Sequence, residues 1–299
     1  MIRIGTDCSG IEAPIQALKN MNIDFRHIFS SDIDKFCIKS IKENYSPEIL
    51  YEQDIRTRKV EDIPDIDLYV CGFPCQPFSN AGRKKGFKDN RGNVFFECIK
   101  VIKHKKPSFF ILENVKGILK KDIWDVIYTE LKTLENIYNI VWKVLNTKDY
   151  GIPQNRERLY IVGKIKDKGI FQFPEHCEMD NIENYIDHND NTYKTTSKRH
   201  EQILSRLQGN NKVFIDFAYG VSTTRSFKNA DRLCPCITVK NSIWCVPKHR
   251  YININELLAL QGFKNFKQCV SDFQTKKQIG NSMSVPVIQK IIENLISIV

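Results

Sequence analysis

The sequence predicts an α/β protein in which a doubly wound, mostly parallel sheet is joined to a smaller, loop-rich region. Two observations lead to this prediction. Short apolar runs alternate with helical patterns over the first 165 residues, and the composition changes after Gly163. Strands that alternate with helices favour parallel pairing, with helices covering both faces of the sheet. The 299 residues are enough for one large domain and a smaller one.

Six apolar runs of strand length are expected to build the sheet. They are Ile2–Gly5, Phe25–Ser30, Leu68–Cys71, Phe109–Leu112, Ile140–Leu145 and Leu159–Val162. Four segments with helical spacing lie between them. They are Ile11–Lys19, Asp34–Glu43, Val94–Lys103 and Ile123–Leu134.

The region after Gly163 has a different character. Residues 166–235 are rich in Lys, Asn, Asp and Thr, and their periodicity is weak. Interspersed apolar residues such as Ile203 and Phe217 indicate a modest core rather than a disordered insert. From Val285 onward, apolar residues recur at helical spacing, so a final helix is expected to cover the large domain. We therefore expect a large domain over 1–165, completed by 247–299, and a small domain over 166–246.

The charge and cysteine content restrict the function and the compartment. A net charge of +10 favours an anionic partner such as nucleic acid, although a Lys-rich chain from an AT-rich genome would show the same excess. No apolar run approaches the roughly 20 residues of a membrane helix, and the first residues lack a signal-peptide layout. The ten scattered cysteines therefore predict free thiols in a reducing cytoplasm. Cys234 and Cys236 are the one close pair, and without a second pair we expect no metal site.

The first strand runs into Thr6–Ile11 and then a helix, which is the arrangement of a nucleotide-binding turn. Gly10 would let a ligand approach the backbone, but a single glycine is weak evidence. Asp32 ends the second strand, where a carboxylate can accept both ribose hydroxyls. Asp54 ends the third strand-like segment and could accept a hydrogen bond from an adenine amino group. Each carboxylate taken singly is better explained as a helix cap or a solvated turn, but three ordered strand ends indicate one site.

A cysteine stands at the tip of the next strand, in Gly72-Phe73-Pro74-Cys75-Gln76-Pro77-Phe78-Ser79. A basic loop with several glycines extends from there to Gly92. A thiol near basic groups can have a lowered pKa and act as a thiolate, and the loop can close over a nucleic-acid backbone. Most of the cysteines fit a buried structural role. Cys75 differs because Pro and Gly surround it and no apolar pattern includes it.

Pro74-Cys75-Gln76, followed by Phe78-Ser79, resembles the catalytic motif of the cytosine-5 DNA methyltransferases. Other motifs of that family occur in its order: Glu113-Asn114-Val115 after the next strand, Gln154–Arg158 before the strand at Leu159, and Gly280-Asn281-Ser282 before the last helix. The resemblance spans nearly the whole chain apart from 166–235. It implies a Rossmann-like, S-adenosylmethionine-dependent methyltransferase fold with a target-recognition domain, of the bacterial or phage restriction-modification type.

The resemblance also implies a mechanism. Cys75 would add to C6 of cytosine so that C5 can attack the sulfonium methyl group. Glu113 would stabilise charge at N3 if burial raises its pKa. Arg158 would hold the cytosine O2, while Arg156 would contact that site or a phosphate. Without the resemblance, a helix cap and surface solvation explain these charged residues. Because C5 and C6 are inaccessible in a duplex, the base must be flipped out.

Two further sets of residues follow from the resemblance. Those expected to bind S-adenosylmethionine are Cys8, Ser9, Gly10, Ile11, Asp32, Ile33, Asp54, Ile55, Gly72, Pro74, Asn281 and Ser282. Those expected to contact double-stranded DNA are Gln76, Ser79, Arg83, Lys84, Lys85, Arg91, Arg199 and Arg225. The small domain offers Asn, Gln, Arg, Ser and Thr on loops, which suit base edges, and its size predicts a short recognition site.

The chain departs from the family pattern at the cofactor end. Cys8 replaces an aromatic residue of the first motif, Glu12 replaces its second glycine, and Ile33 stands where a tryptophan is frequent. The adenine is therefore expected to meet different side chains.

Two other functions stay open at this point. An RNA cytosine-5 methyltransferase would share Cys75 and Glu113, but the Cys-Phe-Thr segment of that branch is absent from this sequence. A nucleic-acid-binding protein with a degenerate fold would not need these residues intact. We expect a monomer that acts on double-stranded DNA, with a cognate restriction endonuclease acting separately.

Overall fold

The computed structural model describes residues 1–74, 94–166, 169, 171–192, 194, 196–206, 212–219, 232–240 and 242–297. The chain forms two compact units. The first consists of Met1–Leu145, Glu157–Glu175 and Ile288–Val299, and the second of Asn146–Arg156 and His176–Val287. Within the described ranges, no helix has the length and apolar character needed to cross a membrane.

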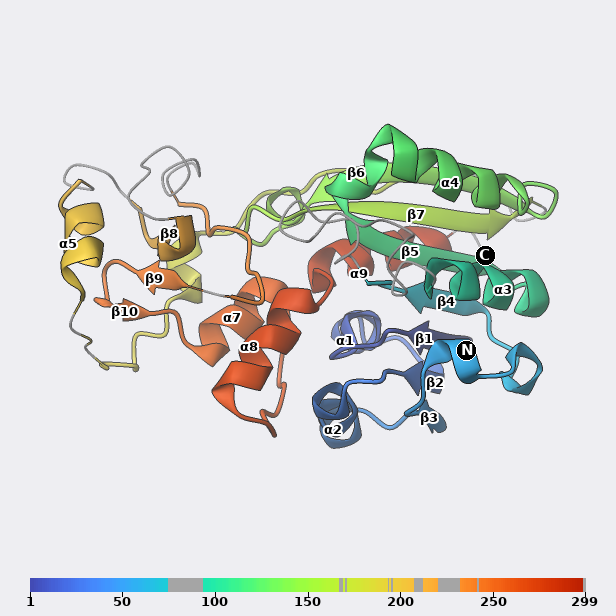
Figure 1. Cartoon of the computed structure of the whole chain (residues 1–299), viewed down its shortest axis with the longest axis horizontal. Coiled ribbons are helices and arrows are strands. Elements are labelled where there is room, and N and C mark those ends of the chain that lie inside the picture. The colour runs from blue at the N-terminus through green and yellow to red at the C-terminus, as the bar shows by residue number, and fades with distance from the viewer. Residues whose placement is uncertain are drawn as a thin grey trace. The chain divides into compact units, whose positions relative to one another are not determined.

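A central sheet organises the first unit (Figure 1). Its described strands lie in the order β3-β2-β1-β4-β5-β7-β6. They are β1 (Ile2–Asp7), β2 (Phe25–Ser31), β3 (Ile49–Tyr51), β4 (Leu68–Cys71), β5 (Phe109–Val115), β6 (Tyr138–Asn146) and β7 (Glu157–Ile165). The first five pair in parallel, whereas β7 runs antiparallel to β5. The predicted doubly wound, mostly parallel sheet is therefore confirmed.

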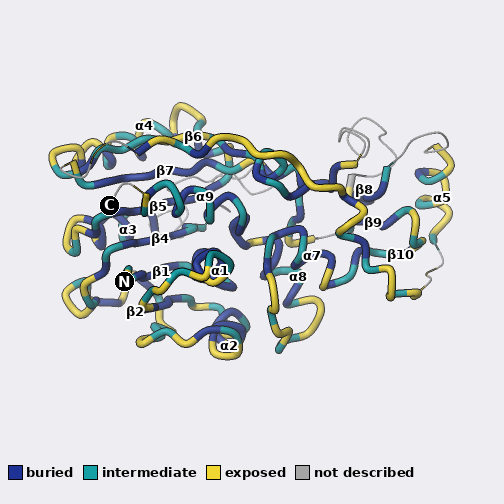
Figure 2. Tube along the Cα trace, turned by 180° about the vertical axis from the view of Figure 1, so that it is seen from behind, coloured by how far each residue is buried: buried dark blue, intermediate teal, exposed yellow. Residues whose placement is uncertain are grey.

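Helices of the first unit lie close to where the periodicity predicted them. They are α1 (Ala13–Asn20), α2 (Lys35–Asn44), α3 (Val94–Lys105), α4 (Lys121–Lys132) and the later part of α9 (Val285–Ile296). The start of α2 is set by a local hydrogen bond, because the Asp34 side chain accepts from Phe36 N at 2.9 Å and caps the helix. The apolar faces of α3 and α4 share one buried cluster with β4 and β5. Figure 2 shows β4 and β5 as largely buried, as expected for strands covered by helices.

The second unit contains a small antiparallel sheet in the order β10-β9-β8 among the described residues. The strands are β8 (Phe214–Asp216), β9 (Ile243–Cys245) and β10 (Arg250–Tyr251), and the helices are α5 (Lys198–Ser205), α7 (Ile254–Gln261) and α8 (Asp272–Asn281). Ile203, Ile215, Phe217 and Trp244 form its apolar cluster. The ring of His200 stacks on Phe217, with centroids 3.9 Å apart, which fixes α5 to this cluster.

The compact units have different bounds from the domains expected from the sequence. Residues 247–287 group with the second unit rather than with the sheet, and so do residues 146–156. The physical reason is polar contact within that unit. Arg250 and Glu256 bind the segment around Asp187, and Arg156 binds main-chain atoms of residues 237–282.

Candidate functional site

The turn from β1 to α1, residues 8–12, takes an unusual backbone path. Cys8, Gly10 and Glu12 have φ angles of 51°, 56° and 57°, in the left-handed region that favours glycine. Ser9 fixes the turn to β2, because Ser9 N donates to Ser31 O at 3.0 Å and Ser31 N donates to Ser9 Oγ at 2.9 Å. Among the described residues, a Cβ at Gly10 would meet only Cys8 O, at 4.0 Å. The backbone is therefore open to a ligand at this position.

Asp32 lies at the end of β2 and closes the same turn. Its Oδ2 accepts a hydrogen bond from Gly10 N at 2.8 Å, and its Oδ1 accepts one from Asp34 N at 2.8 Å. Each oxygen keeps acceptor capacity for a further donor, which suits a pair of hydroxyls. Burial raises the pKa of Asp32 above its ordinary value. The next residue, Ile33, is 68% exposed. Its apolar side chain is therefore accessible for contact with an apolar ring.

Asp54 and Ile55 lie just after β3, where Asp54 caps a short 3-10 helix, η1 (Ile55–Thr57). Arg56 Nε donates to Asp54 Oδ1 at 2.9 Å and Arg56 Nη2 donates to Oδ2 at 2.5 Å, which lowers the pKa of Asp54. An adenine amino group would have to share this carboxylate with Arg56. Ile55 is buried, so its side chain anchors the segment to the core.

A buried ion pair ties this segment to β1. Arg58 Nη2 lies 2.7 Å from Asp7 Oδ2, and the two side chains are 2% and 0% exposed. Tyr69 Oη also donates to Asp7 Oδ2, at 2.7 Å. The Arg58 guanidinium lies over the rings of Phe29 and Tyr51, 5.2 and 4.7 Å from their centroids. Arg58 was not predicted as a functional residue, because an isolated arginine in a sequence usually indicates the surface.

Asn114 holds the segment that leads to residue 75. It is buried, and its Nδ2 donates to Phe73 O at 3.0 Å while its Oδ1 accepts from Val115 N at 2.8 Å. Gly72 and Pro74 are half-buried on either side of Phe73. Asn114 therefore fixes the backbone two residues before Cys75, a role that was not predicted from the sequence.

Eight of the expected site residues lie outside the described part of the chain. They are Cys75, Gln76, Ser79, Arg83, Lys84, Lys85, Arg91 and Arg225. The neighbouring Cys71 is a core thiol: its Sγ lies 3.3 Å from Cys98 Sγ, and burial raises its pKa well above the ordinary value. Cys71 is therefore unsuited to act as a thiolate.

Two of the expected catalytic residues meet across the ladder of β5 and β7. Arg158 Nε lies 3.4 Å from Glu113 Oε1, and the two side chains are 15% and 10% exposed. The register pairs Glu113 with Tyr160 and Val115 with Arg158, so Glu113 and Arg158 are diagonal neighbours on one face. Glu113 and Asn114 lie within β5 and not beyond it, which corrects the strand end expected from the sequence.

Arg156 lies in the second unit and is only 2% exposed. Its Nη1 donates to Ile237 O at 2.8 Å, and its Nη2 donates to Ser282 O at 2.5 Å and Gly280 O at 3.2 Å. This geometry differs from the expected contact with cytosine or a phosphate, because the guanidinium is directed at main-chain carbonyls. It favours a role in holding backbone segments together.

Gln154, like Arg156, binds main-chain atoms of the second unit. It is fully buried, and its Nε2 donates to Leu260 O at 2.7 Å while its Oε1 accepts from Ile237 N at 3.2 Å. Cys234 forms an isolated β-bridge with Gln154, so the close cysteine pair lies in this backbone junction. Among the described residues, no group of His, Cys, Asp and Glu could hold a metal ion. Of the expected cofactor residues on this unit, Asn281 is exposed and Ser282 is buried at the end of α8.

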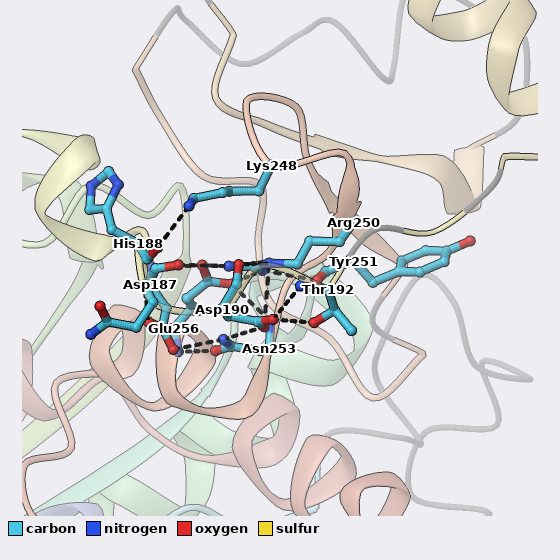
Figure 3. A network of polar contacts seen from close by, with 10 residues as sticks. Asp187, His188, Asp190, Thr192, Lys248, Arg250, Tyr251, Asn253 and Glu256 are labelled. Carbon is cyan, nitrogen blue, oxygen red and sulfur yellow. Dashed lines mark hydrogen bonds and ion pairs between the residues drawn. The ribbon is translucent and has the colours of Figure 1, made fainter.

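A polar network lies at the start of α7 (Figure 3). Arg250 Nη1 and Nη2 bind the two carboxylate oxygens of Glu256 at 2.8 and 2.7 Å, and both side chains are at most 2% exposed. Glu256 also accepts from Asp187 N at 2.9 Å and from Asn253 N at 2.8 Å, the second as half of a capping box.

The same network fixes the segment from Asp187 to Thr192. Asn253 Nδ2 donates to Asp187 Oδ2 at 3.1 Å and to Asp190 Oδ2 at 3.0 Å. Hydrogen bonds from Thr192 and Asn253, with Arg250 nearby, hold the pKa of Asp190 well below its usual range. Outside the network, Arg199 is exposed on α5.

The relatives of this chain are methyltransferases by name. The C-5 cytosine-specific DNA methylase family matches residues 7–297. The Type II methyltransferase M1.ScrFI of Lactococcus lactis subsp. cremoris is 37% identical over 294 residues, which covers 91% of this chain and 72% of the relative. The Type II methyltransferase M.NlaX of Neisseria lactamica is 36% identical over 289 residues, covering 91% and 89%.

Two solved structures share the fold. The Entamoeba histolytica methyltransferase EhMeth matches with a TM-score of 0.76 at 22% identity, over 99% of this chain and 98% of that chain. The S. pombe Dnmt2 methyltransferase matches with a TM-score of 0.69 at 19% identity, over 99% and 98%. Together with the family match over nearly the whole length, the sequence identities mean that this chain belongs to the C-5 cytosine-specific DNA methylase family and is a DNA cytosine-5 methyltransferase.

Proposed function

We propose that the chain transfers a methyl group from S-adenosylmethionine to C5 of a flipped cytosine in a short DNA sequence, with Cys75 as covalent nucleophile. The observation that supports this most is the pairing of Glu113 on β5 with Arg158 on β7, next to Asn114, which holds Phe73 O. An acid, a cation and the backbone that leads to Cys75 thereby lie at the carboxyl end of β5. Ligands bind at such strand ends in doubly wound sheets.

In the proposed reaction, the Cys75 thiolate forms a bond to C6 and places an electron pair at C5. Glu113 stabilises the charge that develops at N3 of the ring. Arg158 binds the cytosine O2 and also orients Glu113. S-adenosylmethionine supplies an electrophilic methyl group when bound. After transfer, loss of the C5 proton, to water in this proposal, restores the C5–C6 double bond and releases Cys75. Arg156 acts in this scheme as a positioning residue.

The cofactor is proposed to bind along the ends of β1, β2 and β3. The open backbone at Gly10, the free acceptor capacity of Asp32 and the exposed Ile33 fit a nucleoside with two hydroxyls and an apolar ring. Cys8, Ser9, Ile11, Asp54, Ile55, Gly72 and Pro74 complete this proposed set on the first unit. Asn281 and Ser282 are assigned to it by family resemblance alone.

DNA contact is proposed to be divided between two regions. The basic loop with Gln76, Ser79, Arg83, Lys84, Lys85 and Arg91 would bind the backbone and the flipped nucleotide. Residues of the second unit, Arg199 and Arg225 among them, would read base edges. We also propose that the enzyme acts as a monomer in the cytoplasm, on double-stranded DNA, within a restriction-modification system whose endonuclease acts separately.

The test is covalent capture. Duplex DNA that contains 5-fluorocytosine at the target, incubated with enzyme and S-adenosylmethionine, should give a complex that survives a denaturing gel. Fluorine cannot leave C5 as a proton does, so Cys75 stays attached. A parallel incubation with labelled S-adenosylmethionine and either DNA or RNA separates the DNA function from the RNA alternative. No shifted band from an enzyme that methylates ordinary DNA would refute the covalent mechanism.

A further inference from the structure

We propose that Glu12 is a positioning residue for cofactor binding: its buried carboxylate holds the turn at residues 8–12 in the backbone path that opens Gly10 to the ligand. The proposal rests on the proposed binding of S-adenosylmethionine at this turn. Glu12 touches no reacting atom in it.

The Glu12 side chain points into the protein rather than toward solvent. It is 0% exposed, and its Oε1 accepts hydrogen bonds from Thr6 Oγ1 at 2.6 Å and Ser30 Oγ at 2.5 Å. Such short distances are typical of strong hydrogen bonds between hydroxyl groups and a carboxyl group. Thr6 lies on β1 and Ser30 on β2, so one carboxylate oxygen joins both strands to the turn. Thr6 Oγ1 also lies 2.7 Å from Ser9 Oγ, which is itself part of the turn.

The neighbouring His27 completes the arrangement. His27 Nε2 lies 2.9 Å from Ser30 Oγ and 3.6 Å from Glu12 Oε1. In the tautomer that carries a hydrogen on Nε2, His27 donates to Ser30 Oγ and leaves the single hydroxyl hydrogen of Ser30 for Glu12. The Ser30 hydroxyl that binds Glu12 is thus itself held in place by His27, on the same strand.

The backbone explains why the side chain is needed. Glu12 has a φ of 57°, a conformation in which a residue other than glycine is strained. Two bonds to buried hydroxyls offset this strain only while the turn follows its present path. The same path aligns Gly10 N with Asp32 Oδ2 at 2.8 Å. Without the hydrogen bonds of the Glu12 carboxylate, residues 8–12 could take other conformations. Cofactor binding would then have to order the turn before Gly10 and Asp32 could contact the cofactor, which lowers the affinity.

Three substitutions of Glu12 separate the carboxylate from the backbone strain. Glu12→Ala removes the acceptor and keeps the strain, so the Kd for S-adenosylmethionine should rise about tenfold to a hundredfold. Glu12→Gly removes the acceptor and also relieves the backbone strain, so it should raise the Kd less than Glu12→Ala does. Glu12→Gln keeps an oxygen acceptor and should stay within about fivefold of the parent enzyme. For all three, kcat at saturating cofactor and DNA should stay within about threefold, because no group at the reacting atoms changes.

The measurements are cofactor titration by calorimetry on the full-length protein, steady-state KM and kcat with DNA, and a melting curve for each variant. Glu135→Ala, which alters an exposed glutamate of the same unit, is the control and should leave Kd and KM unchanged. Should Glu12→Ala fail to fold, Ser30→Ala removes one donor and should raise the Kd about threefold to tenfold.

The proposal is overturned if folded Glu12→Ala binds the cofactor within twofold of the parent, if Glu12→Gly binds as tightly as the parent, or if kcat falls while Kd and KM do not change. These results presuppose that the parent enzyme binds S-adenosylmethionine and methylates DNA. A parent that does neither would instead refute the proposed function.

Discussion

The carboxylate of Glu113 and the guanidinium of Arg158 lie 3.4 Å apart on neighbouring antiparallel strands. Both side chains are mostly buried, so solvent screens the attraction between them only partly. At this distance each side chain orients the other, and we expect Glu113 and Arg158 to act as one unit in catalysis.

Substituting either member of this pair should therefore damage the reaction about as much as substituting both. Glu113→Gln and Arg158→Ala should each lower kcat/KM by about 10²- to 10⁴-fold, with a double variant far less impaired than the product of the two effects. Labelled methyl transfer to duplex DNA measures this. The exposed pair Lys116 and Glu157, 3.2 Å apart, provides the control, since alanine at both should change kcat/KM less than threefold. Independent effects of Glu113 and Arg158 would contradict a shared role.

Cys75→Ala should abolish methyl transfer and leave cofactor binding within about threefold, because the thiolate is required for addition to C6 and not for binding. Transfer assays and cofactor titration on the purified variant measure the two effects. Cys177→Ala alters an exposed cysteine and should keep full activity. Turnover by Cys75→Ala would remove this cysteine from the mechanism.

Cofactor affinity should depend on pH through Asp32. Burial raises the pKa of this carboxyl, so it takes up a proton at a higher pH than an exposed aspartate would. Only the ionised form accepts both hydroxyls, and affinity for S-adenosylmethionine should therefore fall as the pH drops from 7.5 toward 5. Asp32→Asn should bind more weakly at pH 7.5, by about tenfold, and should show a flat profile over this range. Asp62→Asn, at an exposed position, should retain the profile of the parent. A parent enzyme with no pH dependence would show that Asp32 does not bind the hydroxyls.

The second unit should lose stability when its buried ion pair is broken. Arg250→Ala leaves the Glu256 carboxylate buried without its partner, and such changes cost about 3–5 kcal/mol. Urea denaturation followed by Trp fluorescence measures the effect, since Trp244 lies in that unit's core. Lys248→Ala removes a single contact, from Lys248 Nζ to His188 O at 2.9 Å, and should cost less than about 0.5 kcal/mol. Equal losses from the two variants would mean that the network does not stabilise the unit.

Sequence choice should reside in residues 166–246. Base-edge contacts specify a site, whereas phosphate contacts only position the protein. Arg199→Ala or Arg225→Ala should relax the methylated sequence by about 1–3 kcal/mol at one base pair, and exchange of the whole segment with that of a relative should transfer the relative's site. Sequencing of methylated cytosines in cells that express each protein measures this. An unchanged motif in all three would place specificity elsewhere.

The sheet was predictable because its signals are local. An uninterrupted apolar run marks β4, and the structure places that strand at Leu68–Cys71, as predicted. The end of β5 was not predicted correctly. The strand continues through Glu113 and Asn114 because β7 pairs with it as far as Val115. The polar residues 113 and 114 give no sign in the sequence of this pairing with a distant strand.

The positions of single charged side chains were the least predictable part of the site. Arg58 and Arg156 are buried because their partners, Asp7 and the carbonyls of Ile237 and Ser282, come from distant parts of the chain. Helix α8 (Asp272–Asn281) was also missed. Its sequence is mostly polar, and only three of its residues besides Gly280 are buried: Thr275, Gln278 and Ile279. The periodicity that reveals α9 is therefore absent from it.

The contacts that Gln154 and Arg156 make have a consequence for how such enzymes diverge. Most of their partners are main-chain atoms, of Ile237, Leu260, Gly280 and Ser282, and a peptide group is the same whatever side chain it carries. Mutations can therefore accumulate in the segment from His176 to Val287 without loss of these hydrogen bonds, provided that the chain keeps its course. Gly280 is an exception, because a Cβ there would lie 2.4 Å from the carbonyl carbon of Thr238. Substitutions in this segment, which we propose reads the DNA, can thus change its side chains while the junction is inherited unchanged.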